Sequence, residues 1–76
     1  MINEFAVNEA IEEINNLPKG TEFTFADILC RKNIAEAEMF DYFSAVYKKV
    51  KNNVEIPKEY SELFLGLPYN IPYVKK

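Results

Sequence analysis

A chain of 76 residues with a formal net charge of −3 has room for one small domain. Hydrophobic residues make up 49% of it and charged residues 28%, the balance of a folded protein rather than of a disordered one. With no histidine and one cysteine, the usual zinc-ligand sets, Ser-His or Cys-His catalytic pairs and an internal disulfide are excluded. We expect a single domain over residues 1–76 that is not an enzyme and has no catalytic residues, metal or cofactor.

The first predicted element is a helix that follows Asn3 and stops at Leu17, because the residue before Pro18 avoids helical geometry. Asn3 is a suitable N-cap, since its side-chain oxygen can accept a hydrogen bond from the first helical turn. The apolar residues at helical spacing, which we expect to face the core, are Val7, Ala10, Ile11, Ile14 and Leu17.

A turn over residues 18–20 and a short extended piece over 21–23 come next. Thr24 is the predicted N-cap of a second helix over about residues 25–31. We expect Phe25, Ile28 and Leu29 to face inward, and Asn33 to adopt the left-handed geometry that ends a helix.

The third predicted helix, from about Ala35 to Asn52, has the strongest periodicity in the chain. Its acidic residues stand at the start and its lysines at the end, which complements the helix dipole. Glu36, Glu38, Asp41 and Tyr42 are expected on its exposed start. The predicted inward face consists of Met39, Phe40, Phe43, Val46, Tyr47 and Val50.

The last third of the chain is less regular. Val54 and Ile56 alternate with Glu55 as in a strand, and Pro57 to Leu65 could form a short helix followed by Gly66. Residues 69–73 alternate again and predict a closing strand, which Pro72 should place at a sheet edge or interrupt.

Helix, strand, helix, helix and two strands is the element order of a winged helix, so the predicted fold is a small α+β, winged-helix-like domain. The segment LPKGTEFTFADIL, residues 17–29, resembles the L-P-x-G-T-x-F-T-x-x-D-[LI] stretch of a small family of uncharacterised winged-helix-like proteins of Gram-positive bacteria, phages and plasmids. The resemblance implies a DNA-associated regulatory protein of a phage or other mobile element. It brings no catalytic residues with it.

Charge is divided unevenly along the chain. Residues 1–45 carry three basic and nine acidic side chains, a formal charge of −6, and residues 46–76 carry six basic and three acidic ones, a formal charge of +3. Such asymmetry is typical of proteins that bind a charged partner, although a dipolar monomer that binds no such partner has it too. The candidate nucleic-acid-binding residues are Arg31, Lys32, Lys48, Lys49, Lys51, Lys58, Lys75 and Lys76.

Carboxylates crowd the start of the third helix, where the family pattern continues with basic residues and this chain has Ala35-Glu36-Ala37-Glu38. They would repel phosphates. We therefore expect duplex DNA to be bound through lysine–phosphate contacts rather than through base contacts of this helix. The alternative is a protein-binding inhibitor or adaptor whose acidic first half contacts a basic partner protein.

Large apolar residues are concentrated near the C-terminus. Either they form a protein interface, of which a homodimer is the commonest form, or the arm folds back and completes its own core. The predicted interface residues are Leu67, Tyr69, Ile71 and Tyr73.

No basic, apolar leader stands at residues 1–4, and the apolar-rich stretch over residues 63–74 is too short to span a bilayer. We expect a cytoplasmic protein with no membrane partner and no small-molecule substrate. Cys30 lies beside two cations that could lower the pKa of its thiol, but as a neighbour of Leu29 it is expected to be a half-buried apolar residue.

Overall fold

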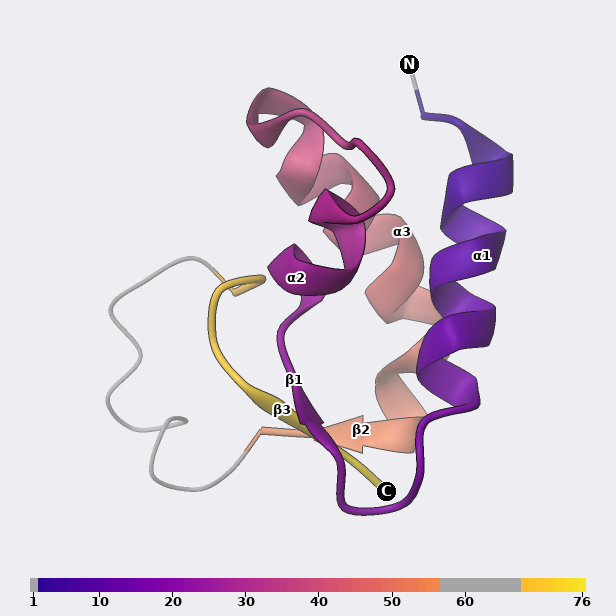
Figure 1. Cartoon of the computed structure of the whole chain (residues 1–76), viewed down its shortest axis with the longest axis vertical. Coiled ribbons are helices and arrows are strands. Elements are labelled where there is room, and N and C mark those ends of the chain that lie inside the picture. The colour runs from indigo at the N-terminus through magenta and orange to yellow at the C-terminus, as the bar shows by residue number, and fades with distance from the viewer. Residues whose placement is uncertain (1, 57–67) are drawn as a thin grey trace.

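The computed structural model describes residues 2–56 and 68–76. Three α-helices lie above a small three-stranded antiparallel sheet (Figure 1), which confirms the predicted α+β class. The helix predicted over residues 57–65 lies outside the described residues. The elements are α1 (Glu4–Asn15), β1 (Glu22–Phe23), α2 (Phe25–Cys30), the 3-10 helix η1 (Glu36–Glu38), α3 (Met39–Val50), the 3-10 helix η2 (Lys51–Asn53), β2 (Val54–Glu55) and β3 (Tyr73–Lys75).

The predicted helix caps are confirmed. Asn3 Oδ1 accepts hydrogen bonds from the amides of Phe5 at 2.9 Å and Ala6 at 3.4 Å. Thr24 Oγ1 accepts one from the amide of Asp27 at 3.1 Å. These bonds satisfy first-turn N–H groups that have no partner within a helix, so they set where α1 and α2 begin.

Two left-handed residues lie in the turns that follow the first two helices. Gly20, with φ of 89°, closes the turn that separates α1 from β1, where a side chain would be strained. Asn33, with φ of 60°, follows α2 as predicted. α1 itself ends at Asn15, two residues before the predicted Leu17, and the amide of Leu17 still donates to the Ile14 carbonyl.

β3 is the central strand, with β1 and β2 on either side of it. Glu22 and Glu55 both oppose Val74, and Phe23 opposes Tyr73. The predicted closing strand is present, but it runs over Tyr73–Lys75 instead of residues 69–73 and lies at the centre of the sheet. Of the two predicted effects of Pro72, the edge position is wrong and the interruption is found. The strand begins only at Tyr73 because Pro72 has no N–H to donate, and after it both sides of the backbone are free to pair.

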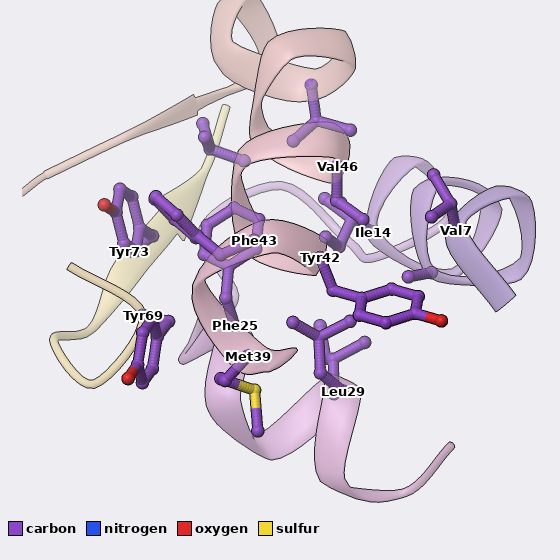
Figure 2. Close-up of a cluster of buried hydrophobic side chains, with 14 residues drawn as sticks. Val7, Ile14, Phe25, Leu29, Met39, Tyr42, Phe43, Val46, Tyr69 and Tyr73 are labelled. Atoms are coloured by element: carbon purple, nitrogen blue, oxygen red, sulfur yellow. The ribbon is translucent and has the colours of Figure 1, made fainter. Parts of the chain in front are cut away.

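The core is an aromatic cluster between α3 and the sheet (Figure 2). The ring of Phe25 lies at the centre of this cluster. Its centroid is 5.0 Å from that of the Phe43 ring and 4.9 Å from that of the Tyr73 ring, and both contacts are edge-to-face. Aliphatic side chains fill the contact between α1 and α3, so one continuous core joins the helices to the sheet. The fully buried large side chains are Phe25, Ile14, Ile28, Leu29, Val46 and Val50.

The inward face of α3 differs from the predicted one at two residues. Phe40 is 55% exposed, whereas Tyr42, expected on the exposed start, is 3% exposed. Figure 2 shows the Tyr42 ring lying between α3 and the start of α1, and its hydroxyl accepts a hydrogen bond from the Asn3 amide at 2.6 Å. The Tyr42 ring is therefore packed in the core, and its hydroxyl has a hydrogen-bond partner there. With Tyr42 on the inward face of α3, Phe40 lies on the exposed face.

Candidate nucleic-acid interface

Arg31 and Lys32, two of the predicted phosphate-binding residues, are engaged within the chain. Glu13 of α1 accepts from Arg31 at 2.6 Å and from Lys32 at 3.2 Å. Ion pairs near the surface add about 0–1 kcal/mol of stability each, and here they connect the residues that follow α2 to α1. Glu13 offsets one of the two positive charges, and Glu9 and Glu12 line the same depression as Lys32, so this side of the molecule offers a phosphate little attraction.

The C-terminal lysines lie beside the end of α3. The amide of Lys76 donates to the Asn53 carbonyl at 2.8 Å, which joins the last residue to the segment directly after Lys51. Lys75 opposes Val54 in the sheet, and Figure 1 shows the C-terminus at the lower end of the molecule. Pairing of β2 with β3 thus gathers lysines that are 24 or more positions apart in the sequence; the basic end, as we call it, consists of Lys48, Lys49, Lys51, Lys75 and Lys76.

Lys19 is a further cation at the basic end that sequence analysis missed. The neighbouring Gly20 amide donates to the Lys75 carbonyl at 2.7 Å, and the Lys75 amide donates to the Thr21 carbonyl at 2.8 Å. The turn that carries Lys19 is therefore fixed against β3. No sequence signal relates residue 19 to residue 75, because only the strand pairing brings them together.

Acidic side chains occupy the other surfaces. Glu36 in η1 and Asp41 in the first turn of α3 are exposed, as predicted. On the outer face of the sheet, Glu22 and Glu55 flank Val74 from the two outer strands. At about 1.5 Å per residue, α3 is roughly 18 Å long, and Asp41 near its start lies roughly 10 Å along the axis from Lys48.

Two of the four predicted interface residues are part of the chain's own core. Tyr69 is 7% exposed and Tyr73 is 2% exposed, and their rings contact Phe43 and Phe25 respectively. Burial raises the pKa of Tyr73 to about 12, with a smaller contribution from Tyr47. For these two side chains the alternative interpretation holds: the arm folds back and completes the core. Ile71 is partly buried against it, and Leu67 lies outside the described residues.

The remaining predicted features are placed as follows. Lys58 lies outside the described residues, and Cys30 is exposed rather than half-buried, because it ends α2 on the side away from the core. No group of three or more potential metal ligands occurs in residues 2–56 and 68–76. In the same part of the chain, no helix combines the length and apolar character needed to cross a membrane.

The chain was compared with protein-family models, with curated proteins and with solved structures. None of the three comparisons finds a match.

Proposed function

We propose that this protein is a non-enzymatic binding module of winged-helix type that associates with duplex DNA through lysine–phosphate contacts at its basic end. The observation that carries the proposal is that the segments of Lys51 and Lys76 are joined by the backbone hydrogen bond between Asn53 and Lys76. The ammonium of Lys75 donates to the Leu17 carbonyl at 3.4 Å, so Lys75 adds its charge beside them. Lys48 and Lys49 extend the same surface along α3. Cations grouped in this way act jointly on neighbouring phosphates, whereas scattered ones do not.

The element order supports the winged-helix assignment. Helix, strand, two helices and two strands follow one another along the chain. In the sheet, the last strand, β3, lies between the two earlier strands, β1 and β2. In winged helices the start of the third helix enters the DNA groove. Here that start carries Glu36 and Asp41, so the groove-facing mode is disfavoured by charge and backbone contacts are the mode that remains.

Binding by anisotropy to a labelled duplex tests this proposal. Lys51→Ala and Lys76→Ala should each weaken binding, and each should reduce the slope of log affinity against log salt by about one. Arg31→Ala removes the same charge from a side chain already paired with Glu13 and is the matched control; it should leave the slope unchanged. Equal losses for all three variants would contradict a localised site.

A second candidate function, supported by a separate observation, is an acidic protein-binding module. Phe40 projects from α3 at 55% exposure, and Asp41 and Glu36 lie near it on the same exposed start. An exposed aromatic ring flanked by carboxylates is typical of a protein contact with a basic, partly apolar partner. Phe40→Ala should abolish such binding without affecting the DNA titration, which separates the two functions.

A further inference from the structure

A groove of about 480 Å³ runs between α1 and α3, away from the aromatic core. Its apolar lining comes from Ile2, Val7, Ile11 and Ala45. Ile2 is 38% exposed at its mouth, so apolar surface is open to solvent there. The proposed DNA contact does not account for this groove, because phosphates gain nothing from an apolar floor.

The groove has a direction, because α1 and α3 run side by side in the same sense. Asn3, before α1, donates from its amide to Tyr42 near the start of α3, and Asn53, after α3, donates from its side chain to Asn15 at the end of α1. Glu4 therefore lies at one end of the groove. Lys48 and Lys49 lie toward the other end, near Ile11.

The two lysines are available to a partner. In residues 2–56 and 68–76 the ion pairs join Glu13 to Arg31 and Lys32, and neither Lys48 nor Lys49 has a carboxylate partner. An apolar floor with two unpaired cations at one end complements a ligand that is apolar on one face and anionic at one end. Each apolar group that fills the groove also covers surface now exposed to water.

The length of the groove fits a helix. From Glu4 to Ile11 is seven residues of α1, or about 10.5 Å along the axis, which equals the distance between the first and last anchors of an i, i+3 or i+4, i+7 pattern. We propose that the α1–α3 groove binds an amphipathic helix of a partner protein, whose apolar anchors fill the groove and whose acidic residues meet Lys48 and Lys49.

A displayed library of helical peptides, selected on the full chain without counter-selection, tests this proposal. We expect enriched peptides with large apolar residues at i, i+3 or i+4 and i+7, and with Asp or Glu clustered at one end. Binding of a selected peptide should fall at least about tenfold in Ala45→Glu, because a carboxylate then occupies the floor. Ala37→Glu makes the same substitution at an exposed residue of η1 that does not line the groove, and it should stay within about twofold of the parent.

Charge reversal gives a second readout that does not depend on how well Ala45→Glu folds. Lys48→Glu with Lys49→Glu changes two exposed side chains and should also weaken the selected acidic peptide at least about tenfold, the more so at low salt. Peptides that bind Ala45→Glu as well as the parent, or that lack acidic residues, would overturn the proposal. So would a parent protein that sediments as a dimer and becomes a monomer in Ala45→Glu, since a second copy would then occupy the groove.

Discussion

At the scale of single residues, exposure on α3 decides which side chains stabilise the fold. Phe40 and Phe43 are three positions apart and their ring centroids are 6.3 Å apart, yet Phe43 is buried and Phe40 is exposed. The spacing of apolar residues does not tell which face of α3 points inward. Met39, Phe40 and Phe43 fit helical spacing as well as Met39, Tyr42 and Phe43 do. Two contacts between distant segments distinguish the two faces: the burial of the Tyr42 ring in the core and the hydrogen bond between Tyr42 and Asn3.

Replacing these phenylalanines should therefore have unequal effects. Phe43→Ala should lower the free energy of unfolding by about 3–5 kcal/mol, the usual range for a buried Phe, and a domain of this size could then be largely unfolded. Phe40→Ala should change it by less than about 0.5 kcal/mol. Urea denaturation of both variants measures this, and equal losses would contradict the observed face of α3.

The Tyr42 hydroxyl has a smaller but separate effect. Tyr42→Phe keeps the ring and removes the acceptor for the Asn3 amide, so the free energy of unfolding should fall by about 0.5–1.5 kcal/mol. The amide of Asn3 should exchange its hydrogen faster in the variant. Unchanged stability and unchanged exchange would show that water replaces the hydroxyl without loss.

Tyr73 should make stability depend on pH in the alkaline range. Burial raises its pKa in the folded state from 10.0 to about 12, so the folded state holds its proton more tightly than the unfolded state does. The stabilisation is present below pH 10 and is lost as the pH rises toward 12, to an extent on the order of 2 kcal/mol. Chemical denaturation between pH 8 and 12 should show this loss in the parent and a smaller one in Tyr73→Phe.

At the scale of elements, local signals predicted the helices and long-range pairing determined the strands. Asn3 and Thr24 cap where expected, because capping depends only on neighbouring residues. Tyr69, Ile71 and Tyr73 alternate like a strand, but the Tyr69 carbonyl accepts from the Ala26 amide at the start of α2 instead of from a neighbouring strand. A strand as short as β3 has too few residues for periodicity to locate it.

The central place of β3 predicts a specific sensitivity to proline. Lys75→Pro removes the amide that donates to the Thr21 carbonyl and should lower the free energy of unfolding by about 1–3 kcal/mol. Lys75→Ala keeps the amide and is the matched control, expected to stay within about 0.5 kcal/mol of the parent. Thermal unfolding of the two variants distinguishes a loss of pairing from a loss of charge.

At the scale of the whole molecule, charge is separated into a basic end and acidic faces. The sequence predicted the separation along α3, because acids stand at its start and lysines at its end. It could not predict that Lys19 joins the basic end, or that Glu13 removes Arg31 and Lys32 from the available cations, since both depend on contacts between distant segments. The candidate DNA surface therefore has fewer cations than the eight that the sequence predicted.

A titration of duplex DNA at several salt concentrations tests the proposed function most directly. The five lysines that define the basic end together with Lys19, at roughly −0.9 per phosphate neutralised, predict a slope of log affinity against log salt of at most about −5. Affinity should be nearly independent of sequence, and Lys51→Ala with Lys76→Ala should reduce the slope by about two. Tight, sequence-selective binding that survives this double substitution, or no binding at low salt, would contradict the account.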